Sequence, residues 1–98
     1  MTDKTLTSLG LAYKAGRVVY GIESITRDLP RCAGLLLASD AGAGATREAK
    51  FLASKANIPL KQLNHPKEAL GRAIGKHLCA VAAITDKGLY NLITASTP

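Results

Sequence analysis

The sequence EALGRAIGK (residues 68–76) is followed, after one histidine, by the apolar run LCAVAAI (residues 78–84). This pattern predicts a short helix that leads through a small cationic loop into a buried strand. The loop glycines allow the main chain to approach a phosphate chain closely, because they carry no side chain. Ile74 and Leu78 offer apolar contact to an exposed base, and Lys76 adds positive charge. The stretch therefore predicts a surface that can hold a nucleic acid.

Outward from this stretch, helical and strand patterns alternate along the chain. Helices are expected at residues 4–15, 22–29, 46–56, 66–74 and 87–93, and strands at residues 18–20, 33–38, 58–63 and 79–84. The second helix is expected to close at Pro30, and the last helix is expected to be capped by Thr85 and Asp86. Residues 94–98 are expected to form a frayed tail. The alternation predicts an α/β protein, a three-layer α/β/α sandwich around a mixed sheet of about four strands. Residues 1–98 are expected to form one domain.

Charge and composition point to a folded, basic binding module. Among 98 residues, 47% are hydrophobic, which excludes a disordered chain. The net charge of +6 favours polyanionic partners.

The sequence suggests neither export nor a cysteine framework. No apolar run reaches the roughly 20 residues that span a bilayer, and the start of the chain lacks the apolar core of a signal peptide. A cytoplasmic protein without a membrane partner is expected. Cys32 and Cys79 are interpreted as small buried hydrophobes, since two isolated cysteines make neither a zinc site nor a disulfide framework.

A second candidate surface lies where Gly21 leads into the expected second helix. Free backbone N–H groups at a helix start attract phosphate, and Arg17 and Arg27 flank this one in sequence. The alternative interpretation is an ordinary glycine-led helix start with solvated charges.

Three stretches carry a resemblance to a known family: LGLAYKAGRVVYG (residues 9–21), ASD (residues 38–40) and EALGRAIGK leading into AVAAITDKG (residues 80–88). Together they resemble the kink-turn RNA-binding ribosomal protein superfamily of the archaeal and eukaryotic large subunit, in particular its bacterial YlxQ-type branch. The resemblance implies the three-layer sandwich, with RNA held by the glycine-led helix start and the loop after LGRAIG.

The resemblance also assigns residues. Gly21 matches the turn glycine and Arg27 the basic position of the second helix, while Glu23 and Ser24 stand where kink-turn binders carry an Asn-Glu pair that reads base edges. Because Glu23 is negative and Ser24 is short, recognition by shape and phosphate is expected in place of that base reading.

The loop after the fourth helix matches the family more closely. Ile74, Gly75, Lys76, His77 and Leu78 continue the family's apolar loop, which covers a flipped-out base in relatives. Ile74, Lys76 and Leu78 are the expected contacts.

The segment from Asp40 to Arg47 lies between an expected strand and helix. Its Gly42-Ala43-Gly44 sequence could indicate a nucleotide site, but it lacks the third glycine of a dinucleotide motif and the Lys-Ser or Lys-Thr of a P-loop. We interpret it as a flexible loop bordering the RNA surface, with Arg47 and Lys50 as phosphate contacts.

Catalysis and metal binding find little support in the sequence. His65 and His77 are too few for a zinc site, and the seven carboxylates show no acid–base pairing. The four aromatic residues are also too few for a base-stacking sheet.

The expected function is non-enzymatic binding of structured RNA, ribosomal or noncoding, without cofactor, metal or small-molecule substrate. The ribosome or other RNA-binding domains are expected as further partners. The alternative is a protein-interaction or scaffold domain of a larger nucleic-acid-binding protein with weakened RNA readout.

Overall fold

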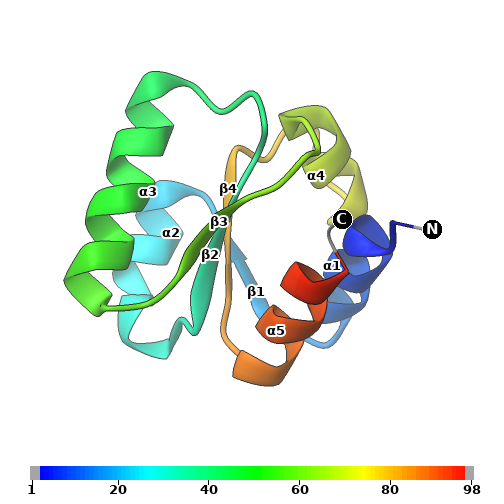
Figure 1. Cartoon of the computed structure of the whole chain (residues 1–98), viewed down its shortest axis with the longest axis horizontal. Helices are drawn as coiled ribbons and strands as arrows, with labels where there is room; N and C mark the ends of the chain where they lie inside the picture. The colour runs from blue at the N-terminus through cyan, green and yellow to red at the C-terminus, as the bar shows by residue number, and fades with distance from the viewer. Residues whose placement is uncertain (1–2, 97–98) are drawn as a thin grey trace.

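A computed structural model describes residues 3–96 of the chain. Figure 1 shows a central sheet with α2 and α3 on one face and α1, α4 and α5 on the other. The elements, in chain order, are α1 (Thr5–Lys14), β1 (Val18–Tyr20), α2 (Ile22–Arg27), the 3-10 helix η1 (Leu29–Arg31), β2 (Gly34–Leu37), α3 (Ala43–Ala56), β3 (Leu60–Gln62), α4 (Lys67–Ala73), β4 (Val81–Ile84) and α5 (Lys87–Ala95).

The sheet has the strand order β1-β4-β2-β3. Strand β4 is antiparallel to both β1 and β2, whereas β2 and β3 are parallel. The predicted three-layer sandwich with a mixed, four-stranded sheet is therefore confirmed.

The two central strands are buried on both faces, which explains their unbroken apolar sequences. Successive side chains of a strand point to opposite faces. Leu36 of β2 consequently joins the core beneath α1, α4 and α5, while Leu35 and Leu37 join the core beneath α2 and α3. Strand β4 alternates in the same way. The sheet thus carries two separate hydrophobic cores, one for each helical layer.

Helix α5 is fastened to the sheet by Tyr90. Its hydroxyl donates a hydrogen bond to the carbonyl oxygen of Leu35 at 2.9 Å, and burial raises the pKa of Tyr90 to about 12. A Cβ atom on Gly34 would lie 2.5 Å from the Tyr90 ring. The ring therefore packs against β2 at a position that only glycine leaves open.

Two expected helix boundaries differ from the structure. Helix α2 ends at Arg27 and Pro30 lies inside η1, where its missing N–H and fixed φ are compatible with an early position of the 3-10 turn. Helix α3 starts at Ala43, three residues before the expected Thr46. The small residues there show no apolar periodicity, yet alanine favours the helix.

Two strands and the last helix also differ from expectation. Strand β3 starts at Leu60, so Pro59 precedes it instead of lying near its start. Residue Cys79 precedes β4, because its N–H donates to the carbonyl oxygen of Lys67 in α4 instead of joining the sheet. Thr94 belongs to α5, and its hydroxyl donates to the carbonyl oxygen of Tyr90 at 3.0 Å. Of the expected tail, residues 97–98 lie outside the described residues. No helix within residues 3–96 is long and apolar enough to cross a bilayer.

Candidate nucleic-acid interface

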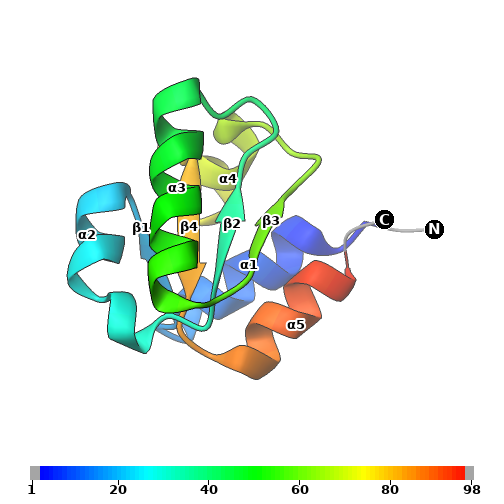
Figure 2. The same cartoon turned by 60° about the vertical axis from the view of Figure 1, so that its left-hand side comes forward.

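Strands β1 and β2 end, and β4 begins, at one end of the sheet. We call this the loop end and define it as residues 20–24, 38–42 and 75–80. The N–H of Gly21 donates to the carbonyl oxygen of Val81 at 3.2 Å, and that of Ala38 donates to Ala80 at 2.8 Å. Figure 2 shows α4 and the first turn of α3 at the same end. The turn after β1 and the loop after α4, both predicted to bind RNA, are therefore neighbours.

The loop after α4 is held against its own helix. The N–H of Lys76 donates to the carbonyl oxygen of Gly71 at 2.7 Å. A Cβ atom on Gly71 would lie 2.8 Å from the carbonyl oxygen of His77 and 2.9 Å from the Cα atom of Leu78. Gly75 makes the turn with φ +71°, a region that favours glycine. The conformation of this loop is therefore set by close backbone packing.

Lys76 joins the two parts of the loop end. Its Nζ lies 5.0 Å from the centroid of the Tyr20 ring, a cation–π distance. The polar interaction with the Tyr20 side chain is the largest cause that raises the pKa of Lys76 above its ordinary value, and the electrostatic effect of Tyr13 comes second. The exposed ammonium group is therefore charged at neutral pH. The positive charge therefore lies at the junction of the turn and the loop.

Ile74 does not occupy the exposed position expected of a base contact. It is 1% exposed and packs in the core beneath α4. Leu78 is 51% exposed, and Gly75 and His77 are exposed as well. The apolar surface of the loop is thus provided by Leu78, whereas Ile74 anchors the loop from below.

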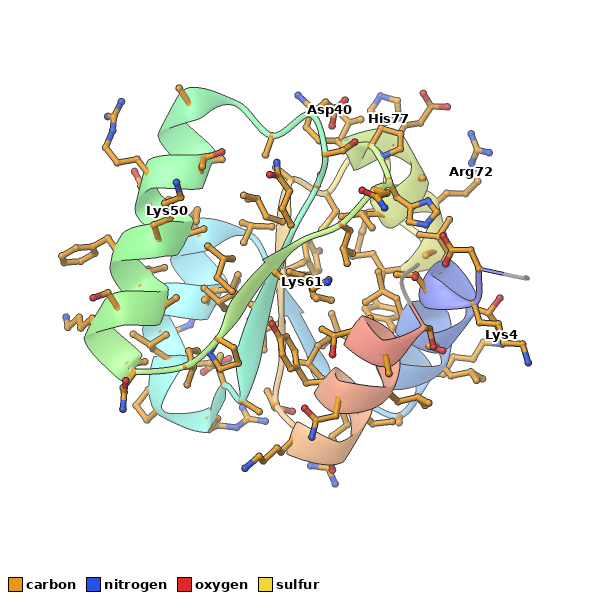
Figure 3. All side chains as sticks on the ribbon, in the orientation of Figure 1. Lys4, Asp40, Lys50, Lys61, Arg72 and His77 are labelled. Atoms are coloured by element: carbon orange, nitrogen blue, oxygen red, sulfur yellow. The ribbon has the colours of Figure 1, made fainter. Side chains whose placement is uncertain are left out.

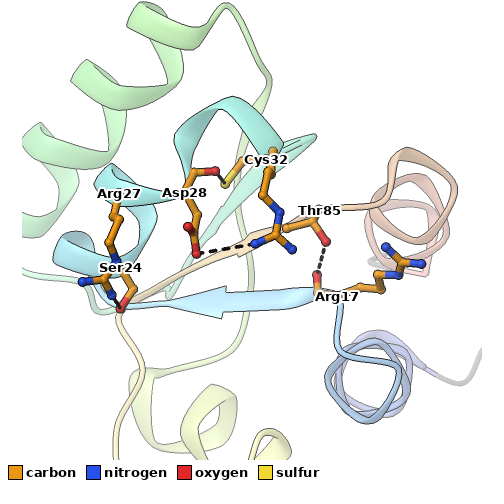
Figure 4. Close-up of polar contacts among 7 residues, drawn as sticks. Arg17, Ser24, Arg27, Asp28, Cys32 and Thr85 are labelled. Atoms are coloured by element: carbon orange, nitrogen blue, oxygen red, sulfur yellow. Dashed lines mark hydrogen bonds and ion pairs between the residues drawn. The ribbon is translucent and has the colours of Figure 1, made fainter.

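Arg17 lies away from the loop end, contrary to its expected place beside Gly21. Its carbonyl oxygen accepts hydrogen bonds from the Thr85 N–H at 2.9 Å and hydroxyl at 3.4 Å, at the opposite end of β1 (Figure 4). Four residues of extended chain separate Arg17 from Gly21 by about 13 Å. Arg17 is therefore not part of the same surface.

Helix α2 contributes to this surface mainly through its side chains. It has only six residues, so its helix dipole is weak. The Arg27 Nη2 donates to the Ser24 hydroxyl at 3.4 Å, as Figure 4 shows. Both side chains line a hollow of about 310 Å³ with Tyr20. Glu23 is exposed in the first turn of the helix. Arg27 thus lies beside the loop end, next to Ser24 and near two acidic residues, Glu23 and Asp28.

Asp40 has a structural contact. Its Oδ1 accepts a hydrogen bond from the N–H of Lys67 at 2.8 Å, which satisfies a free donor at the start of α4, where Pro66 provides no side-chain cap. Figure 3 places Asp40 and His77 at the same end of the molecule. The carboxylate therefore holds the segment after β2 against α4.

The expected glycine loop before α3 is the start of the helix. Gly42 is the residue before the first turn, and Gly44 lies within that turn. Arg47 and Lys50 follow on α3, both exposed (Lys50 is labelled in Figure 3). These two cations lie on α3, beyond the first turn that Figure 2 shows at the loop end.

The titratable groups provide no metal cluster in the described part of the chain. Within residues 3–96, no three His, Cys, Asp or Glu side chains could hold an ion together. His65 instead pairs with Asp3, with 2.8 Å between Nε2 and Oδ2. Desolvation raises the pKa of Cys79 to about 11 and also raises that of Cys32. Both thiols are therefore neutral at physiological pH.

Tyr20 is the contributor to this surface that the sequence interpretation missed. The sequence interpretation assigned Tyr20 only to the strand β1. Its position directly before the turn at Gly21 places it at the end of this edge strand, and that position was the available signal. An aromatic residue there is 38% exposed and available to a cation on the neighbouring loop.

The three-layer fold, with a braced loop beside a glycine turn at one end of the sheet, is that of a ribosomal-protein-like module. The chain belongs to the Ribosomal protein L7Ae/L30e/S12e/Gadd45 family, whose sequence profile matches residues 3–93. The family resemblance found in the sequence is therefore confirmed.

Individual proteins agree with this assignment. The RNA-binding protein YlxQ of Bacillus subtilis (strain 168) is 32% identical over 85 residues, which cover 85% of this chain and 84% of that protein. A solved structure of a protein with unknown function from Bacillus halodurans superposes with a TM-score of 0.86 at 30% identity, covering 97% of both chains. The Giardia lamblia 15.5kD RNA binding protein superposes with a TM-score of 0.70 at 17% identity, covering 93% of this chain and 79% of that one, which shows a shared fold.

Proposed function

We propose that this protein binds structured RNA, without catalysing a reaction, and that the loop end is its contact surface. Membership of the family and similarity to a protein named as RNA-binding support the class of ligand. The location of the proposed site rests on one observation, the distance of 5.0 Å between Lys76 Nζ and the centroid of the Tyr20 ring. This contact joins the loop after α4 and the turn after β1 into one cationic surface.

The braced loop favours binding of a folded ligand. Since its backbone is held against Gly71, little conformational entropy remains to be lost when RNA docks. Lys76 positions a phosphate, and the exposed Leu78 offers apolar contact to an unstacked base. Arg27 adds a second cation beside Tyr20.

The α2 side chains favour recognition by shape and phosphate. Exposed Glu23 places a negative charge next to the RNA, and Ser24 is engaged by Arg27. Neither residue supports the base-edge reading of an Asn-Glu pair. A bent ribosomal or noncoding RNA element, kink-turn-like in shape, is the ligand class that these residues fit.

Fluorescence anisotropy at low salt with a kink-turn RNA, and gel shift with total cellular RNA, test this proposal. The double variant Lys76→Glu/Arg27→Glu should abolish retention of RNA with an unchanged circular dichroism spectrum, because it reverses both cations. Lys87→Glu is the matched control, since Lys87 follows β4 at the opposite end of the sheet.

The outcomes separate the alternatives. Unchanged binding by the double variant would move the site away from the loop end. Failure of the wild-type protein to retain either RNA would favour the scaffold function.

A further inference from the structure

A groove runs between α2 and α3, outside the loop end. Two neighbouring hollows, of about 410 Å³ and about 550 Å³, share Thr26 and Lys55 in their walls. The smaller hollow is also lined by Arg47 and Phe51, and the larger one by Arg27. We call this feature the α2–α3 groove and define it by these five residues.

The groove is cationic. Arg27, Arg47 and Lys55 lie in its walls, against the single carboxylate of Glu48. Among residues 3–96, no ion pair engages any of the three cations, which leaves their charge free for a ligand. The electrostatics thus favour an anionic occupant.

Phe51 lies between two of these cations and is 64% exposed. Arg47 precedes it by four residues and Lys55 follows it by four, so the three side chains share one face of α3. The helical rise spaces Arg47 and Lys55 by about 12 Å. An aromatic face with a cation on each side can stack a base while the flanking charges meet the backbone phosphates.

The groove adjoins the proposed RNA surface on one side, at Arg27, while its far part lies near Pro30 and Ile58, before β2 and β3 begin. Arg27 also lines the hollow that contains Tyr20 and Ser24.

A protein partner would call for a broad exposed apolar patch. The apolar lining of the groove includes Leu29, Cys32 and Leu52, which are buried, and Phe51 is the one exposed large hydrophobic side chain among residues 3–96 that lines it. The charges and the lone ring fit a nucleotide strand better.

We infer that the α2–α3 groove binds a single-stranded RNA segment flanking the structured element, with one base stacked on Phe51 and phosphates against Arg47 and Lys55. This inference rests on the RNA-binding function proposed above and extends it. Because a stacked base presents only its ring face, the groove tolerates any base sequence in the segment.

Anisotropy with three RNAs tests the inference: a kink-turn RNA with blunt ends, the same RNA with a single-stranded tail of about ten nucleotides, and the tail alone. For the wild-type protein, the tail should raise the affinity about tenfold, the value of one base stacked on an aromatic ring. Phe51→Ala should lose this gain and leave the affinity for the blunt RNA unchanged, and Phe51→Trp should keep it. The exposure of Phe51 makes both variants compatible with folding.

Each outcome decides between the ideas. No gain from the tail, or a gain that survives Phe51→Ala, would overturn the inference while leaving the loop-end function intact. Binding of the tail alone, sensitive to Phe51→Ala, with no binding of the blunt RNA would support the groove and overturn the loop-end proposal. A fluorescent acidic, aromatic peptide provides a further comparison. If this peptide binds the wild-type protein but not Phe51→Ala, and the RNA tail has no effect on affinity, the inference is overturned in favour of a protein partner.

Discussion

Replacing Gly71 by alanine adds one methyl group where α4 touches the loop end. In an ordinary helix this change is favourable, since alanine stabilises a helix interior by about 1 kcal/mol relative to glycine. Here the new Cβ would lie 2.8 Å from the carbonyl oxygen of His77 and 2.9 Å from the Cα of Leu78. Both are backbone atoms, so the loop itself must move.

The magnitude follows from two opposing effects. Overpacking of this kind costs about 1 to 3 kcal/mol, and the gain in helix propensity offsets about 1 kcal/mol. Gly71→Ala should therefore lower the free energy of unfolding by about 1 kcal/mol, which corresponds to a fall in Tm of roughly 4 to 8 °C for a domain of this size. Displacement of Lys76 and Leu78 should weaken RNA binding as well.

Gly44→Ala is the matched control, because Gly44 lies in the first turn of α3 and a Cβ atom there would meet no atom within 4 Å. The same substitution should leave stability unchanged or raise it by up to about 1 kcal/mol, and leave affinity for blunt RNA unaltered. Urea unfolding of both variants, followed by circular dichroism, gives the comparison. Equal stabilities for the two variants would refute the argument that the loop is fixed by its approach to Gly71.

Three further predictions concern charge, packing and pH. If Lys76 and Arg27 each neutralise a phosphate of the blunt-ended RNA, its log affinity should fall against log salt with a slope of roughly −1.5 to −2, and a salt-independent affinity would contradict this. Gly34→Ala, which brings a Cβ to 2.5 Å from the Tyr90 ring, should destabilise the fold by about 1 to 3 kcal/mol in thermal melts, and a wild-type Tm would show that the ring can move aside. The buried thiol of Cys79 has its pKa raised from 9.0 to about 11, so the folded state favours the neutral form. The contribution of this thiol to the free energy of unfolding is therefore present below pH 9 and is lost as pH rises through about 11. Between these pH values, Cys79→Ala should lose less free energy of unfolding than the wild-type protein. An equal loss would assign the effect to other groups such as Tyr90, whose pKa is also raised.

The sequence by itself determined the layers of this protein. The apolar runs of β2 and β4 predicted strands buried on both faces, and Gly21 and Gly75, both with positive φ, were correctly placed at turns. These signals are local, because a strand pattern or a glycine turn depends on neighbouring residues. Membership of the family also followed from the sequence, since its motifs extend over most of the chain.

Only the tertiary structure decided which side chains form the candidate site. Ile74 and Leu78 are both apolar and close in sequence, yet one is 1% and the other 51% exposed, because the loop folds back over Gly71. Arg17 was separated from the surface by the length of β1, and Tyr20 was brought to Lys76 because β4 pairs beside β1. These contacts join residues far apart in the chain. They depend on strand order and register, which no local pattern specifies.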